Sequence, residues 1–338
     1  AKLEVTKGVV IEEIRQALTN PSSREADAHK ARLYQGTPYA HPVLGSEQVI
    51  RRLSRDEVLE YYRSRYVPNN MLAVLMGPVG EKTALAKVGK AFGTEAARPP
   101  APPIGPLPAP PPRAGVYLEE TTATRKSLAL SLIVPESERD RYPAWEVLGG
   151  LLNERLRQAK DRAGAPRILT LGGSFSLGRR FALLQVSATF PRETDEAEVR
   201  RLVDGEMARL AVGMIEPEEV ARIRKSLMGE KARLAERIHY YAMAKAAGIL
   251  ALRAAGVRTY GDKIGRTLPE DVERVARTLA EPRYVASLFL PAEARANPQS
   301  ATALPSPQRA ILPNGLTVIA QEIPGSPVFA AHVLIRGR

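Results

Sequence analysis

The chain contains no cysteine in its 338 residues. This absence excludes disulfide bonds, thiolate metal sites and cysteine nucleophiles, and it leaves the redox compartment and the localisation open. Runs of about 18 apolar residues are also missing, so the sequence predicts no membrane-spanning segment. The first residues, Ala1–Glu4, are not followed by an apolar stretch, so we do not expect them to form a signal peptide.

Aromatic residues make up only 5% of the chain, too few for a surface on which nucleic-acid bases could stack. The net charge of +12 would suit nucleic acid, an anionic membrane surface or acidic peptides. However, the basic residues are interspersed with acids, as in Arg222–Lys225, which follows Glu216, Glu218 and Glu219. We therefore interpret the charge as solvated helix faces and expect no nucleic-acid partner.

Residues 3–33 have a helical pattern that is interrupted by a turn near Asn20 and Pro21. Within it, Lys7–Arg15 is amphipathic and carries two adjacent acids, Glu12 and Glu13. Adjacent residues lie about 100° apart on a helix, so at most one of the two can face a given site. From these residues alone, a solvated surface acid is as acceptable as a metal ligand or a general base, and more common.

Further helices and strands follow in both halves of the chain. Ser54 begins a capping box with Glu57, and its helix ends at Pro68, before an apolar run, Met71–Met76, of strand length. A helix is predicted for 81–92. Strands are predicted for 116–120, 126–134, 168–175, 181–190 and 284–290, with helices around Trp145, after Thr194 and from Glu216, and a second capping box at Thr267–Glu270.

Proline-rich segments divide the sequence. Nine prolines between Arg98 and Arg113 predict a stiff spacer, although a ligand for an aromatic groove is an alternative. We expect the C-terminal part of a first module in 1–97, a linker in 98–113, a second module in 114–293, a linker in 294–309 and the start of a further module in 310–338.

The spacing within the two modules indicates an internal duplication. Val58 and Val272 are separated by the same distance in sequence as Pro68 and Pro282, and in both places a capped helix leads to an apolar run. The last residues contain a tight turn at Pro313–Gly315, entering one strand, and a second predicted strand at 328–335. A compact domain rarely ends on two uncovered strands, so this tail is expected to begin a module that continues beyond the sequence.

Several motifs together resemble the pitrilysin/insulinase family of zinc metallopeptidases, the inverzincins, and especially their bacterial members related to mitochondrial processing peptidase. They are Gly8–Ile14, Tyr39–Gly45, Leu53–Asn70 with its Tyr-Val-Pro-Asn-Asn ending, Tyr142–Gly150, and Leu312–Val318. The resemblance implies an α+β fold of homologous α/β-sandwich modules, each a mixed or antiparallel sheet with helices packed on one face. Two halves of such modules would close over an unstructured peptide substrate.

The resemblance also implies a zinc site. In active members a helix bears His-x-x-Glu-His, whose histidines bind Zn²⁺, and a glutamate on a later helix is the third ligand. Alignment with the pattern Val-Val-x-x-Glu makes that ligand Glu13 rather than Glu12. An open fourth position would activate water, with the motif glutamate as general base.

This chain departs from the family pattern because it contains no His-x-x-Glu-His. Its four histidines, His29, His41, His239 and His332, are scattered and more typical of core or surface residues. Thr6 also stands where many members have an acid, seven residues before Glu13. One glutamate cannot hold catalytic zinc, so we expect the chain alone to bind zinc weakly or not at all and to have no peptidase activity.

Two hypotheses follow. The chain is a segment of a zinc metalloendopeptidase whose histidine motif precedes Ala1, with the missing half or a homologous subunit as its partner. Alternatively, it is a non-catalytic structural or substrate-binding subunit of the same family. An unrelated α+β binding protein is a third possibility, against which the duplicated spacing argues.

Overall fold

The computed structural model describes residues 2–99, 105–111, 114–163, 168–281, 283–292, 308–313 and 317–320. The chain divides into two compact units, residues 1–292 and 293–338. The second unit, where it is described, is an antiparallel pair of strands, β6 (Gln308–Ile311) and β7 (Thr317–Ala320). The predicted strand at 328–335 lies outside the described residues. In the part of the chain that the structure describes, no helix has the length and apolarity to cross a membrane.

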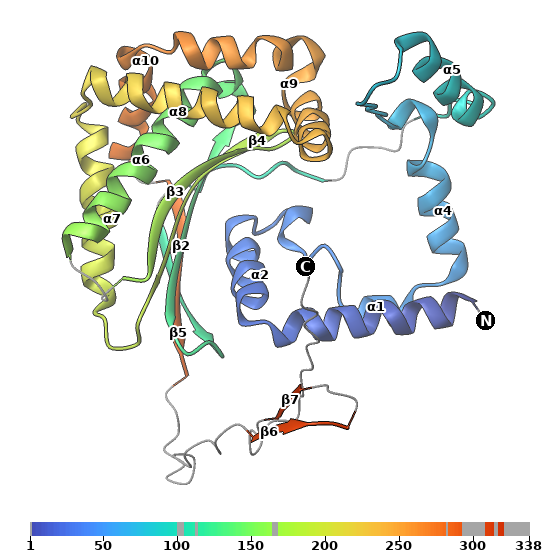
Figure 1. Ribbon diagram of the computed structural model, residues 1–338, viewed down its shortest axis with the longest axis horizontal. Coiled ribbons are helices and arrows are strands. Elements are labelled where there is room, and N and C mark those ends of the chain that lie inside the picture. The colour runs from blue at the N-terminus through green and yellow to red at the C-terminus, as the bar shows by residue number, and fades with distance from the viewer. Residues whose placement is uncertain are drawn as a thin grey trace. The chain divides into compact units, whose positions relative to one another are not determined.

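A five-stranded mixed sheet organises the first unit, with the order β1-β5-β2-β4-β3 (Figure 1). Strands β1 and β5 are parallel, and the other neighbours are antiparallel. The strands confirm the predicted ones, with ends that differ by a few residues: β1 (Gly115–Thr121), β2 (Lys126–Pro135), β3 (Thr170–Leu177), β4 (Phe181–Phe190) and β5 (Tyr284–Pro291). The last strand in sequence, β5, thus lies between the first two.

One face of the sheet is covered by helices, which Figure 1 shows together on one side. These helices are α6 (Tyr142–Ala163), α7 (Glu196–Ala211), α8 (Pro217–Ala235), α9 (Ile238–Arg266) and α10 (Pro269–Ala276). Alternate residues of β2, including Leu128, Leu130 and Leu132, meet Trp145 and Leu148 of α6 in the core. The apolar side chains that alternate along β2 therefore face the helices, as the period of two in the sequence indicates.

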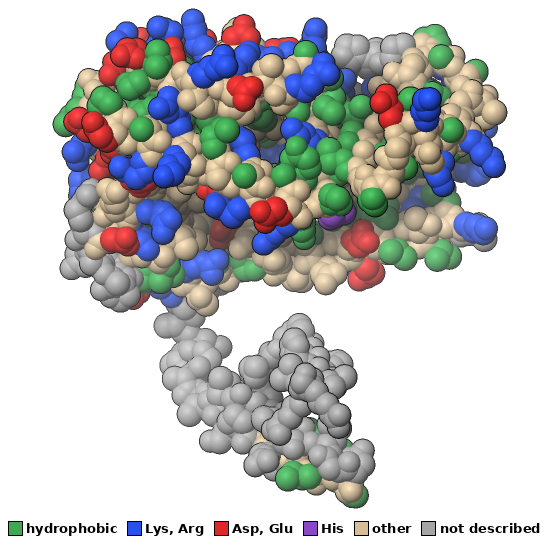
Figure 2. Space-filling model, turned by 45° about the horizontal axis from the view of Figure 1, so that its top comes forward, with side chains coloured by type: hydrophobic (Ala, Val, Ile, Leu, Met, Phe, Trp, Pro, Cys, Tyr) green, Lys and Arg blue, Asp and Glu red, His purple; other side chains and the backbone are tan. Residues whose placement is uncertain are grey.

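The outer surface of these helices carries both signs of charge. Figure 2 shows Lys and Arg side chains interspersed with Asp and Glu side chains on the face that it presents. Ion pairs join many of them, such as Arg200 with Asp204 along α7. This mixed surface agrees with the interpretation of the positive charge as solvated helix faces.

The N-terminal segment is helical and precedes the sheet in sequence. It contains α1 (Lys2–Thr19), α2 (Pro21–Leu33), the 3₁₀ turn η1 (Pro38–Ala40), α3 (Glu47–Arg52), α4 (Arg55–Arg65), the 3₁₀ turn η2 (Pro68–Asn70) and α5 (Glu81–Phe92). Helix α2 packs on the face of the sheet opposite α6. A second apolar cluster forms there, in which Leu33 and Tyr34 contact Ile133, Phe181 and Val285.

Two local predictions are wrong. Residues 71–76 form no strand, because none of the described strands pairs with them and an isolated strand cannot satisfy its backbone. Most of their side chains are exposed to solvent, with Met71 50% exposed. The second predicted capping box does not form: the N-cap is Leu268, whose side chain has no acceptor, although its N–H donates to the Asp271 carboxylate. The Thr267 hydroxyl donates instead to the Lys263 carbonyl.

The two segments of equal spacing therefore differ in packing. Helix α4 has the predicted capping box, in which Ser54 and Glu57 bond to each other's backbone N–H groups, yet Val58 is 40% exposed. The corresponding Val272 is fully buried, because α10 packs against α6 in the main core. The duplication and the module boundaries remain predictions. Within the proline-rich linker, residues 100–104 and 112–113 lie outside the described residues.

Candidate functional site

Helix α1 brings the two candidate acids to the surface. Ile11 and Ile14 are buried on one side of the helix, so Glu12 and Glu13 between them are both exposed. The Glu12 carboxylate accepts a hydrogen bond of 2.8 Å from Arg15. Among the described residues, Glu13 has no hydrogen bond or ion pair to another side chain.

Arg15 also connects α1 to α3. Its guanidinium donates to both carboxylate oxygens of Glu47, at 2.9 and 3.2 Å. The side-chain hydrogen bonds from Arg15 and Arg51 lower the pKa of the Glu47 carboxyl. The two adjacent acids therefore differ: Glu12 belongs to an ion-pair network, and Glu13 has no side-chain partner among the described residues.

The donors for a complete zinc site are not assembled. Among the described residues, no group of three His, Asp or Glu side chains is placed to hold a metal ion. His29 is buried against the sheet, while His41 and His239 are exposed and distant in sequence from Glu13. His332 lies outside the described residues. A catalytic zinc needs about three protein ligands, so the described residues do not by themselves fit the metal.

A cavity of about 550 Å³ lies between α6, α8 and β3. Glycines let these elements approach: a Cβ on Gly150 would lie 2.5 Å from Ile223 Cγ2, and one on Gly149 would lie 2.9 Å from Phe175 Cβ. Both glycines belong to the Tyr142–Gly150 motif. Close packing of α6 against its neighbours explains why the motif has glycine at these two positions.

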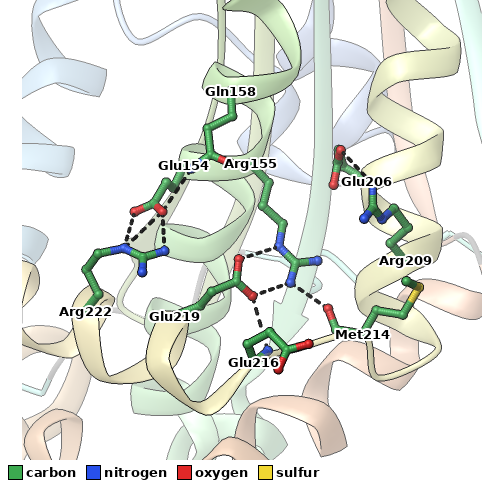
Figure 3. A network of polar contacts seen from close by, with 9 residues as sticks. All are labelled: Glu154, Arg155, Gln158, Glu206, Arg209, Met214, Glu216, Glu219 and Arg222. Carbon is green, nitrogen blue, oxygen red and sulfur yellow. Dashed lines mark hydrogen bonds and ion pairs between the residues drawn. The ribbon is translucent and has the colours of Figure 1, made fainter. Parts of the chain in front are cut away.

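A polar network joins α6 to α8 beside this cavity (Figure 3). Arg155 donates to both carboxylate oxygens of Glu219, at 2.5 and 3.2 Å, and to the Met214 carbonyl at 2.6 Å. Burial alone would raise the pKa of Glu219, but the hydrogen bond from Arg155 and its charge bring that pKa below the ordinary value. Arg222 and Glu154 form a more exposed pair nearby. These contacts fix the two helices relative to each other.

A third polar group lies between α2 and the opposite face of the sheet. The ring nitrogens of His29 lie 2.9 Å from the hydroxyls of Ser287 and Ser131, and Glu25 accepts hydrogen bonds from Thr121 and Ser127. Sequence reasoning did not identify this group. The available signal was the spacing of Glu25, His29 and Leu33, which places all three on one side of a helix.

The fold is of the α+β class: a mixed sheet is covered by helices on one face, and a helical segment that carries the exposed Glu13 precedes it in sequence. The family profile described as peptidase M16 inactive domain matches residues 52–227, just over half of the chain. The chain belongs to the peptidase M16 family.

Curated relatives and solved structures agree with this assignment. An uncharacterized zinc protease of Mycobacterium tuberculosis is 32% identical over 96 residues, which cover 28% of this chain and 22% of that protein. The matched segment thus spans less than a quarter of the relative's length.

Solved structures show the same fold. A putative M16-like peptidase from Alicyclobacillus acidocaldarius has a TM-score of 0.74 at 18% identity, covering 86% of this chain and 71% of that one. A peptidase M16 inactive domain from Pseudomonas fluorescens gives 0.72 at 17% identity, with 87% and 71% covered. The first half of the periplasmic protease PqqL from Escherichia coli gives 0.67 at 14% identity, with 85% and 65% covered.

Proposed function

We propose that the chain is a segment of an M16-type zinc metalloendopeptidase that hydrolyses unstructured peptides, and that it contributes Glu13 as one zinc ligand. The observation that carries this proposal is the difference between the two acids of α1. Glu12 is bonded to Arg15, whereas Glu13 is exposed and has no side-chain partner among the described residues. A metal ion bound by Glu13 would therefore displace no side-chain contact among the described residues, whereas one bound by Glu12 would compete with Arg15.

The remaining ligands would come from a His-x-x-Glu-His helix outside these 338 residues, and the catalytic half would pair with a second half or a homologous subunit. The names of the mycobacterial relatives as zinc proteases support the metal. The likeness to one half of PqqL supports a larger assembly. Residues 114–292 would then be a non-catalytic module that supports the site.

A non-catalytic subunit of the same family is the second candidate. It is favoured by the match to the inactive-domain profile and by the lack of a three-ligand cluster among the described residues. In that case the protein would bind peptide or a partner subunit, and Glu13 would hold no metal. The reading frame preceding Ala1 separates the two candidates, because only the first requires His-x-x-Glu-His there.

The decisive experiment compares Glu13→Gln with Glu12→Gln in the complete protein. We expect Glu13→Gln to lower both the zinc content, measured by elemental analysis after dialysis, and peptide hydrolysis. Glu12→Gln is the matched control, one residue away and also exposed, and should leave most of the zinc in place. Equal loss of zinc in both variants would contradict the assignment of Glu13.

The isolated chain provides a separate test. Because it supplies one candidate ligand in its described residues, we expect no tight zinc binding in a calorimetric titration with zinc alone. About one tightly bound zinc per chain would show that the chain holds a complete site of its own.

A further inference from the structure

Helix α2 lies on the face of the sheet that α6 does not cover, and it meets the strands through polar side chains as well as apolar ones. Glu25 and His29 are one helical turn apart and therefore lie one above the other on α2. His29 is 6% exposed and fits between two strands, with Nδ1 2.9 Å from Ser287 Oγ on β5 and Nε2 2.9 Å from Ser131 Oγ on β2.

Glu25 extends this contact along the sheet. One carboxylate oxygen accepts a hydrogen bond of 2.5 Å from the Thr121 hydroxyl at the end of β1, and the other accepts one of 2.7 Å from Ser127 on β2. The two α2 side chains thus bond to three adjacent strands, β1, β5 and β2. We call Glu25, His29 and their four hydroxyl partners the α2 clasp.

The hydroxyls around His29 are buried almost completely: Ser131 is 1% exposed and Ser287 is 0% exposed. Gln185 on β4 donates to the same Ser131 oxygen at 3.3 Å. The groups that β2, β4 and β5 present to the imidazole are therefore neutral.

The charged side chains near His29 belong to α2 and β1, and none of them is hydrogen-bonded to the imidazole in the described residues. The Glu25 carboxylate is bonded to the two hydroxyls, and Arg32 on α2 pairs with Glu119 on β1 at 2.8 Å. Lys30, next to His29 in sequence, lines the same cavity, but the two hydrogen bonds of the His29 ring go to Ser287 and Ser131. No carboxylate among the described residues contacts the imidazole.

We propose that the α2 clasp holds the N-terminal helices on the sheet at neutral pH and releases them when His29 takes up a proton. A protonated imidazole in this position would be a buried charge with hydroxyl groups as its only partners, and such a charge is unfavourable without a counter-ion. Released from the sheet, His29 would be solvated and would carry the proton without penalty.

The direction of the pH effect follows from the burial of His29. Burial lowers the pKa of His29 from its usual 6.5 to about 4. Above pH 6.5 both states are neutral at this residue, and the clasp is fully stable. As the pH falls from 6.5 toward 4, the released state binds the proton first, so the clasp weakens throughout this range. Between pH 7 and pH 4.5 the released fraction should rise roughly 50-fold.

The test is hydrogen exchange of the full chain between pH 7 and pH 4.5, followed by mass spectrometry and corrected for intrinsic exchange rates. We expect peptides from α2 to lose protection on acidification, while Trp145 in the core on the other face keeps its fluorescence. His29→Gln should remove most of this pH dependence. His239→Gln, at an exposed histidine on α9, is the matched control and should behave as the wild type.

Unchanged protection of α2 between pH 7 and pH 4.5 would overturn the proposal, and so would an equal loss in wild type and His29→Gln. If His29→Gln fails to fold, NMR titration of the wild-type histidine ring replaces it. A ring that titrates well below the other histidines supports the clasp, and a ring that titrates with them contradicts it. The α2 clasp is a property of the fold and does not require that Glu13 bind zinc.

Discussion

The buried ion pair between α6 and α8 should be one of the most sensitive points of the fold. Arg155→Met removes the guanidinium that bonds to Glu219 and to the Met214 carbonyl, while an apolar side chain of similar length still fills the space. Exposed fractions of 11% for the Arg155 side chain and 20% for that of Glu219 mean that little water can replace the lost donor. Removing one partner of a buried pair costs about 3–5 kcal/mol.

Glu219 keeps a hydrogen bond of 3.2 Å from the Glu216 backbone N–H, so we expect the lower end of this range, about 3 kcal/mol of unfolding free energy. Urea unfolding can be followed through Trp145, the sole tryptophan, which is 2% exposed. Arg222→Met is the matched control. Its pair with Glu154 has the same 2.5 Å separation, but the Arg222 side chain is 52% exposed. Losing this pair should therefore lower the unfolding free energy far less.

Acidification should reduce the difference in unfolding free energy between Arg155→Met and the wild type. In the wild type the pKa of Glu219 is lowered, because the contribution of Arg155 outweighs burial. The ion pair therefore stabilises the fold at pH values above the ordinary carboxyl pKa. This stabilisation is lost as the pH falls past that value toward the lowered pKa of Glu219. In Arg155→Met the burial of Glu219, which favours the protonated acid, is opposed only by the hydrogen bond from the Glu216 N–H and the charge of Arg222. The reasoning is refuted if Arg155→Met is no more destabilising than Arg222→Met at pH 7.

Two further substitutions probe packing and capping. Gly150→Ala would place a Cβ 2.5 Å from Ile223 and should lower the unfolding free energy by about 1–3 kcal/mol. The control is Gly205→Ala on α7, whose Cβ would meet no atom within 4 Å. In the same urea titration it should be neutral or stabilising. Ser54→Ala should cost about 1 kcal/mol of α4 stability, seen as roughly fivefold faster hydrogen exchange in its first turn, with Ser64→Ala as control. Equal changes in stability for Gly150→Ala and Gly205→Ala would contradict the packing argument, and equal changes in exchange rate for Ser54→Ala and Ser64→Ala would contradict the capping argument.

Several elements of local structure could be predicted from the sequence because their signals are local. Leu128, Leu130 and Leu132 alternate with other residues along β2, and this period of two alone indicates which side of the strand is buried. The Ser54 capping box depends on residues three apart and formed as predicted. The family resemblance rested on such local motifs, and the profile match bears it out.

Long-range pairing was decided by the tertiary structure. The run at 71–76 has the apolarity of a strand but no strand partner among the described residues, whereas 284–291 acquires two neighbours, β1 and β2. A strand exists only through hydrogen bonds to a neighbouring strand, and no pattern within 71–76 or 284–291 reports whether such a partner is present.

The same division applies to the candidate site. The sequence by itself determined that Glu12 and Glu13 cannot both face one ligand, because the helix geometry separates them by about 100°. The bond between Glu12 and Arg15, three residues apart on α1, is itself local, and the tertiary structure adds Glu47 of α3 as a second partner of Arg15. Likewise, the sequence does not distinguish His29 from any other lone histidine. Its partners Ser131 and Ser287 lie on strands far apart in the chain, so only the fold brings them together.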